Sequence, residues 1–115
     1  MNKTIKRKWV KALRSGRYIQ GASCLRSEDN EYCCLGVLAS QMGKRWTKQL
    51  YAQAYKIVSK GDDTLDLYLD GVYLLPKSVQ ERAGLSKKIQ ESLSNKNDSG
   101  RWSFTRIADW IEKNL

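Results

Sequence analysis

Hydrophobic positions recur at helical spacing near the amino terminus of this 115-residue chain. Residues 4–15 form an expected helix, and the apolar positions that share one side of it are Ile5, Trp9, Ala12 and Leu13. Thr4 is the expected N-cap, and Gly16 is placed to end the helix in a left-handed conformation. Trp9 and Leu13 are therefore expected to anchor this segment in the core.

Further helices are predicted in the middle and at the end of the chain. A short one over 34–42 contains Gly36, which costs about 1 kcal/mol relative to alanine, so we expect another element to approach its backbone closely. Two more are expected over 79–83, between Pro76 and Gly84, and over a segment that ends near Asn97. The last follows Ser103 as N-cap, with apolar residues at Phe104, Ile107, Ala108 and Ile111.

Strand-like runs lie between these helices. The polar run 27–30 separates segments 23–26 and 31–34, which predicts a hairpin, while 46–55 fits either a helix or a strand. Three strands are expected over 55–59, 64–69 and 72–75, with Asp70-Gly71 as a hairpin turn. The order of elements predicts an α+β fold in a single domain over residues 1–115, with an antiparallel sheet of hairpins packed against the helices.

Positive charge is concentrated in the first predicted helix. The chain has a net charge of +9, of which residues 1–17 contribute +7 without a single acidic residue. Lys3, Arg7, Lys11 and Arg14 fall within about 80° of arc, so they form a stripe about 16 Å long opposite the apolar side. Such a stripe is typical of a surface that faces an anion, and the alternative is a solvated helix face.

A second group of candidate residues combines cations with an aromatic side chain. Trp46 lies beside Lys44, Arg45 and Lys48, and Arg17 extends the basic amino-terminal segment. Tryptophan near basic residues can stack on a nucleic-acid base or a nucleotide ring. We therefore include these five residues in the predicted surface for anions and nucleic acids, with burial in the core as the alternative for Trp46.

Catalytic and metal-binding patterns are weak. The chain has no histidine, which excludes mechanisms that need imidazole. Cys24, Cys33 and Cys34 fit buried structural thiols better than a nucleophile or a zinc site, although Cys24 and Cys33 could stand opposite each other across the predicted hairpin. Asp62, Asp63, Asp66 and Asp70 are spaced as turn and strand residues. We expect a protein that is not an enzyme and needs no cofactor or metal.

The loop-like run 95–100 has oxygen side chains spaced as in a calcium loop, but Arg106 stands where that loop requires a carboxylate. The interpretation we prefer is a tight connection between helices. Asn97 or Asp98 would then bind backbone amides, and Gly100 would supply a positive φ.

Four blocks of sequence together resemble a family of small, largely uncharacterised proteins of bacteriophages and prophages. They are Trp9-x-x-Ala12-Leu13-Arg14-Ser15-Gly16-Arg17-Tyr18-x-Gln20-Gly21, Tyr32-Cys33-Cys34-Leu35-Gly36-Val37-Leu38, Leu75-Pro76-x-x-Val79-Gln80-x-x-Ala83-Gly84-Leu85, and Asn97-Asp98-Ser99-Gly100 followed by Phe104-x-x-Ile107-Ala108-x-x-Ile111-Glu112. The resemblance implies an accessory protein that redirects host machinery or blunts host defences by stoichiometric binding.

Charge and resemblance together favour a nucleic acid or nucleoprotein of the host as the partner. The chain has no apolar run long enough to span a membrane and no secretory pattern, so we expect it in the host cytoplasm, away from membranes. Two alternatives remain open. The protein could sequester a small nucleotide that signals in host defence, or it could inhibit a host enzyme through a protein surface around residues 46–55.

Overall fold

A computed structural model describes residues 1–49, 53–58 and 71–115. The helices are α1 (Lys3–Arg14), α2 (Cys34–Gln41), α3 (Lys77–Ala83), α4 (Lys87–Asp98) and α5 (Phe104–Asn114). The strands are β1 (Ile19–Gln20), β2 (Glu31–Tyr32), β3 (Arg45–Gln49) and β4 (Ala54–Val58). These elements confirm the predicted α+β fold of a small single domain. The expected strand over 64–69 and the acidic residues at 62, 63, 66 and 70 lie outside the described residues.

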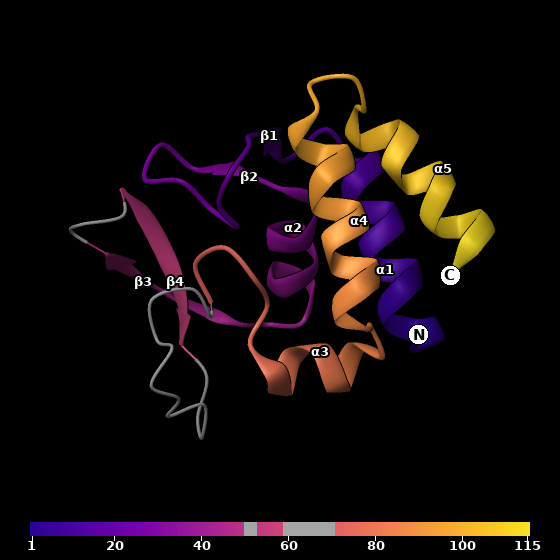
Figure 1. Cartoon of the computed structure of the whole chain (residues 1–115), viewed down its shortest axis with the longest axis horizontal. Coiled ribbons are helices and arrows are strands. Elements are labelled where there is room, and N and C mark those ends of the chain that lie inside the picture. Colours follow the sequence, from indigo (N-terminus) through magenta and orange to yellow (C-terminus); the bar gives the residue numbers. More distant parts are fainter. Residues whose placement is uncertain (50–52, 59–70) are drawn as a thin grey trace.

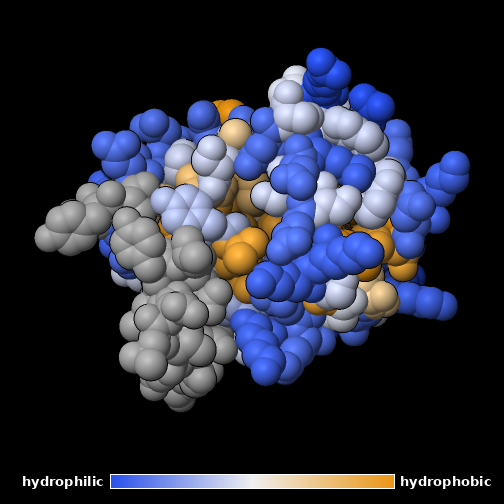
Figure 2. Space-filling view, in the orientation of Figure 1, coloured by the Kyte–Doolittle hydropathy of each residue, from blue (hydrophilic) through white to orange (hydrophobic). Residues whose placement is uncertain are grey.

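Helix α2 occupies the centre of the molecule. All of its residues from Cys34 to Ala39 are buried, and α1 and α4 both pack against it. Helix α5 packs on α1 and α4, and α3 lies across one end of this group of helices. The strands lie on the side of the molecule away from α5 (Figure 1). Hydrophilic side chains cover α3 and α4, and hydrophobic ones show between these helices and the strands (Figure 2). The buried side of every long helix therefore meets α2 or a neighbour of α2.

The amphipathic prediction for α1 is confirmed. Trp9 and Leu13 are buried, and the indole Nε1 of Trp9 donates a hydrogen bond of 2.8 Å to the Cys34 carbonyl oxygen. The N-cap is Asn2 rather than Thr4, because the Asn2 side chain accepts a hydrogen bond from the Ile5 amide. Gly16 has the expected positive φ, +74°, and reverses the chain after the helix.

The close approach of another element to Gly36, predicted from its place in a helix, is confirmed, and the approaching residue is Leu25. A Cβ atom built on Gly36 would lie only 1.9 Å from the carbonyl oxygen of Leu25. Leu25 is itself fully buried, and its carbonyl oxygen accepts a hydrogen bond from the Cys33 amide. Glycine at this position therefore lets the segment before β2 lie directly on the buried helix α2.

Asn97 joins three segments that are far apart in sequence. Its Oδ1 accepts hydrogen bonds from the Cys34 amide at 3.1 Å and from Gln20 Nε2 at 3.2 Å, and its Nδ2 donates to the Gly21 carbonyl oxygen at 2.8 Å. The N-cap residue of α2, Cys33, makes no capping hydrogen bond with its own side chain. Asn97 therefore caps α2 from the last turn of α4.

The run 95–100 was expected to connect two helices, but α4 continues through Asp98, so the connection to α5 begins only at Ser99. The expected hydrogen bonds to backbone amides and the positive φ of Gly100 are confirmed. Asp98 accepts a hydrogen bond from the Ser23 amide, and Gly100 has a φ of +75°. The other buried polar side chain, Gln90, has no hydrogen-bond partner for either amide atom among the described residues. Of the two buried side-chain amides in α4, that of Asn97 thus has hydrogen-bond partners, and that of Gln90 has none among the described residues.

The strands differ from the prediction in two places. Arg26 and Tyr32 form the antiparallel bridge of the expected hairpin, but β2 also pairs in parallel with β1, with Ile19 opposite Glu31. Within this hairpin the Cys33 amide donates to the Leu25 carbonyl oxygen. Cys33 is thus opposite Leu25, and the expected pairing of Cys24 with Cys33 is wrong by one residue.

The ambiguous segment that begins at Trp46 forms strand β3, which pairs antiparallel with β4 and places Trp46 opposite Ile57. Residues 72–75 form a turn with one isolated bridge residue instead of the expected strand. The Gly71 amide donates to the Leu74 carbonyl oxygen, which closes this turn, and Pro76 directly after it begins α3 as N-cap.

Candidate anion-binding surface

The exposed side of α1 carries cations along most of its length. Lys3, Arg7 and Lys11 are exposed, as the predicted stripe requires, and Lys8 is exposed beside them. None of these four side chains forms an ion pair with an acidic group of the described residues. Because α5 and α2 cover the other sides of the helix, this side remains open to a partner.

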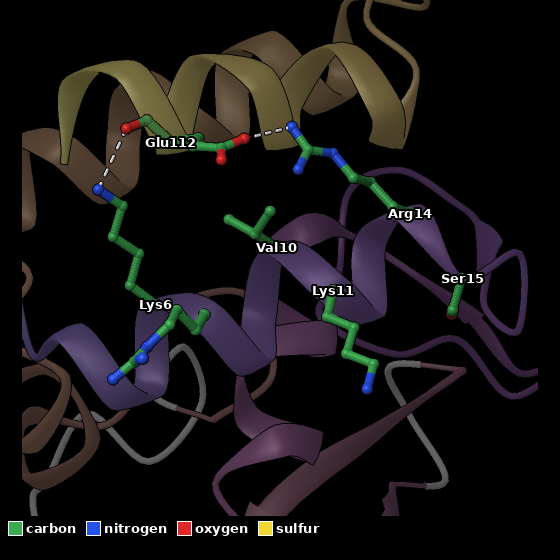
Figure 3. Close-up of a pocket in the computed structure, with 7 residues that line it drawn as sticks. Lys6, Val10, Lys11, Arg14, Ser15 and Glu112 are labelled. Atoms are coloured by element: carbon green, nitrogen blue, oxygen red, sulfur yellow. Dashed lines mark hydrogen bonds and ion pairs between the residues drawn. The ribbon is translucent and has the colours of Figure 1, made fainter.

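Arg14, the fourth residue of the predicted stripe, turns toward α5. Its guanidinium contacts Asp109 at 2.7 Å and Glu112 at 2.5 Å, and the hydrogen bonds to these two carboxylates raise the pKa of Arg14 further above its ordinary value. Lys6 donates to the Glu112 carbonyl oxygen at 3.1 Å, so Glu112 joins α5 to both ends of α1 (Figure 3). The charge of Arg14 is therefore largely neutralised within the protein.

A groove of about 530 Å³ lies between these contacts, with Val10 as its apolar residue. Its lining residues are Lys6, Arg7, Val10, Lys11, Arg14, Ser15 and Glu112. The side chain of Lys11 points away from α5, whereas Lys6 and Arg14 reach toward Glu112 (Figure 3). Four cations and one carboxylate line this groove, and the carboxylate is paired with Arg14.

A second hollow, of about 420 Å³, lies at the carboxy-terminal end of α1. Its lining residues are Lys8, Lys11, Ala12, Ser15, Arg17, Tyr18 and Gln41. The three cations in this set come without a carboxylate, and Gln41 Nε2 donates a hydrogen bond of 2.8 Å to the Tyr18 hydroxyl. This hollow therefore combines positive charge with neutral hydrogen-bonding groups.

Aromatic rings connect this hollow with β3. Tyr18 lies edge-on to Tyr32 with ring centroids 5.0 Å apart, and Tyr32 lies edge-on to Trp46 at 6.3 Å. The guanidinium of Arg26 lies 4.0 Å from the centroid of the Tyr55 ring. It also lies 5.5 Å from the centroid of the Tyr32 ring and 5.6 Å from that of the Trp46 ring. Tyr18 contacts Tyr32 and Tyr32 contacts Trp46, so these three rings form a continuous row that we call the aromatic ladder.

Of the second predicted group, Trp46 and its basic neighbours lie at the far end of this ladder, whereas Arg17 lines the hollow at the Tyr18 end. Trp46 is half-buried and packs against the core, with the Tyr32 ring and the Arg26 guanidinium beside its own ring. Arg45 and Lys48 are exposed and Lys44 is half-buried. The structure thus links the two predicted groups through Tyr18 and Tyr32.

Sequence reasoning missed three residues of the second hollow. Lys8 lies within the basic amino-terminal block but outside the arc of the predicted stripe. Tyr18 belongs to the first block of the family resemblance, which was a usable signal. Gln41 carries no signal in the sequence, because only the packing of α2 beside the end of α1 brings it to the hollow.

The surroundings of the three cysteines disfavour the thiolate form that a nucleophile needs. All three are free thiols, and burial raises the pKa of Cys33 to about 12 and that of Cys34 well above its ordinary value. Cys24, which is half-buried, also has a raised pKa, chiefly because of burial. A thiol with a raised pKa holds little thiolate at neutral pH, and only the thiolate attacks.

The raised pKa of Cys33 predicts a loss of stability in alkali. In the unfolded chain the pKa of this thiol lies near 9. Its contribution to the free energy of unfolding is therefore complete below pH 9 and disappears as the pH rises toward 12. The free energy of unfolding should fall by about 1.4 kcal/mol per pH unit for this thiol over that interval. Urea titrations between pH 7 and 11 measure it, with Cys33→Ala as control for every other titrating group. Parallel curves for the two proteins above pH 9 would contradict the prediction.

The fold and these surfaces define a small α+β domain with a basic helix on its surface. The chain belongs to the family described as Domain of unknown function (DUF8296), whose model matches residues 1–115. Neither a curated protein nor a solved structure matched the chain. Among the helices of the described residues, none has the length and apolar character that crossing a membrane requires.

Proposed function

We propose that this protein acts without catalysis, by binding a host partner that contains nucleic acid through the exposed side of α1. The observation that carries the proposal is the set of unpaired cations on α1, with Lys3, Arg7 and Lys11 spaced one helical turn apart. Each cation that meets a phosphate releases condensed counterions, which favours association.

The arrangement of carboxylates supports the same proposal. Asp109 and Glu112, the acidic residues that α5 brings to α1, are engaged by Arg14 and so do not neutralise the three stripe cations. The buried side of α1 holds Trp9 and Leu13 in the core, which fixes the direction in which those cations project. A rigid row of positive charge loses little conformational freedom of its backbone when it binds.

Reversal of the stripe charges tests this proposal. The variant Lys3→Glu/Arg7→Glu/Lys11→Glu should bind labelled duplex DNA, single-stranded DNA and RNA at least about tenfold more weakly near 0.1 M salt. The magnitude of the slope of log K against log salt should fall by about 2.7 for duplex DNA and by about 2.1 for the single strands, because three phosphate contacts are lost. Fluorescence anisotropy across a salt series measures both quantities. Arg14 is left intact, so that its contacts with α5 do not confuse the result.

A matched control reverses the same number of charges elsewhere. Lys77, Lys87 and Lys88 are exposed on α3 and α4, and their triple reversal to Glu changes the net charge equally. We expect this control to change the salt slope far less than the stripe variant does. Equal losses in the two variants would show that net charge, rather than α1, drives binding and would overturn the proposal.

The biological setting we propose comes from the resemblance to bacteriophage and prophage proteins. Its four blocks are spread along the chain from residue 9 to residue 112, and they support a stoichiometric accessory protein that acts against host defence or on host machinery in the host cytoplasm. Affinity capture from host cells with and without nuclease tests the partner class. A partner lost on nuclease treatment supports nucleic acid, and one retained supports inhibition of a host protein instead.

A further inference from the structure

We infer that the hollow at the end of α1 binds a terminal phosphate, a phosphomonoester at the end of a nucleic-acid strand or on a free nucleotide. The inference rests on the proposed function and deepens it, because it assigns one chemical group to one place on the basic surface. Lys8, Lys11 and Arg17 line this hollow of about 420 Å³ together with Tyr18 and Gln41.

The chain reversal after α1 builds the hollow. Gly16 adopts a φ of +74°, and the Ser15 hydroxyl accepts a hydrogen bond from the Arg17 amide while it donates to the Ala12 carbonyl oxygen. These bonds hold the backbone of Arg17 against the last turn of the helix. Arg17 therefore lines the same hollow as Lys8 and Lys11 instead of extending away from α1.

Tyr18 offers a hydroxyl proton at the same place. Gln41 Nε2 donates to the Tyr18 oxygen at 2.8 Å, so that oxygen is an acceptor in this contact and its own proton is available to a ligand. The ring is held edge-on by Tyr32 at 5.0 Å. The hollow thus has a positioned neutral donor in addition to its three cations, which is an arrangement suited to phosphate oxygens.

The charge balance favours a phosphomonoester over an internal phosphodiester. A phosphomonoester carries about −1.5 to −2 charges at neutral pH, whereas a diester carries one. Three cations without a lining carboxylate compensate the larger charge, and they outweigh the partial negative charge of about −0.5 at the carboxy-terminal end of a helix. The neighbouring groove differs because a carboxylate, that of Glu112, lines it and would repel a phosphate directly.

Helix capping alone does not explain these cations. A basic residue in the last turn of a helix is favoured by the helix dipole, and this accounts for Lys11. Lys8 lies outside the last turn, and Arg17 lies beyond the end of α1. Their convergence on one hollow is a feature of the tertiary arrangement that the dipole does not require.

The test compares one short single-stranded oligonucleotide in three forms: 5′-phosphorylated, 3′-phosphorylated and with hydroxyls at both ends. We expect a terminal phosphate to tighten binding by about tenfold, which corresponds to one charge-assisted contact that a hydroxyl end cannot make. Arg17→Gln should bring the ratio between phosphorylated and unphosphorylated strands close to one, and Tyr18→Phe should reduce it. Lys3→Gln, on the exposed side outside the hollow, should weaken all three forms and leave the ratio unchanged.

A thermal-shift comparison of adenosine 5′-monophosphate with adenosine separates the two sources of the phosphate. Stabilisation by the nucleotide but not by the nucleoside, lost in Arg17→Gln, supports the free-nucleotide source even if no strand binds. Discrimination among strands without a nucleotide shift supports the strand end. Equal binding of all three strands together with no nucleotide shift overturns the phosphate site. Salt-dependent binding of the strands in that case leaves the proposed function standing.

Discussion

Gly36→Ala should lower the free energy of unfolding by at least about 3 kcal/mol, because the added methyl group overlaps backbone atoms. The new Cβ would lie 1.9 Å from the Leu25 carbonyl oxygen and 2.7 Å from its carbonyl carbon. Neither atom can swing aside as the end of a flexible side chain would, so α2 or the hairpin must move. Urea denaturation and thermal melting measure the loss.

Gly43→Ala is the matched control for this substitution. Gly43 follows α2 with a φ of +71°, but a Cβ on it would have no atom within 4 Å. Its cost should be limited to the strain of the left-handed backbone, about 1 kcal/mol. A loss for Gly36→Ala as small as that for Gly43→Ala would show that α2 does not lie against Leu25 as described.

Asn97→Ala should lower the free energy of unfolding by about 3 kcal/mol, since buried polar groups lose their partners and each costs about 1–3 kcal/mol. The Cys34 amide loses its acceptor and the Gly21 carbonyl oxygen loses a donor, and both lie where Asn97 itself is 3% exposed. The melting temperature should fall by about 10 °C or more. Denaturation at neutral pH gives both values.

Asn95→Ala provides the control within the same helix. Asn95 is exposed and lies two residues before Asn97 in α4. Alanine has the higher helix propensity, so this variant should be neutral or slightly more stable. Comparable losses at the two positions would assign the effect to α4 in general and would rule out a special role for the Asn97 amide.

The pattern of apolar residues predicted most of the helices because each helix needs one buried side. The positions expected to face the core in α1 and α5, including Trp9 and Ile107, are buried, except for Ile5, which is only partly buried near the start of α1. The strands were harder to predict, since pairing depends on neighbours that are distant in sequence. Nothing local in Ile19–Gln20 indicates a parallel partner, and the turn that begins at Gly71 accepts hydrogen bonds from the distant amides of Leu25 and Ile57.

The candidate surface was predictable only in part. The exposure of Lys3, Arg7 and Lys11 follows from helical periodicity, because Trp9 and Leu13 determine which side is buried. The pairing of Arg14 with Asp109 and Glu112 could not be predicted, since α5 is brought beside α1 only by the packing of the whole chain. The same reason applies to Gln41, which reaches Tyr18 from the end of a different helix.

The sequence by itself determined that a basic, amphipathic helix begins this α+β domain, because charge content and apolar spacing are local properties. Only the tertiary structure decided which cations stay unpaired and which converge. Arg14 is engaged by α5, whereas Arg17 returns to the hollow shared by Lys8 and Lys11. Electrostatic interactions depend on distance in space, and those distances are set by the buried contacts of α1 with α2 and α5.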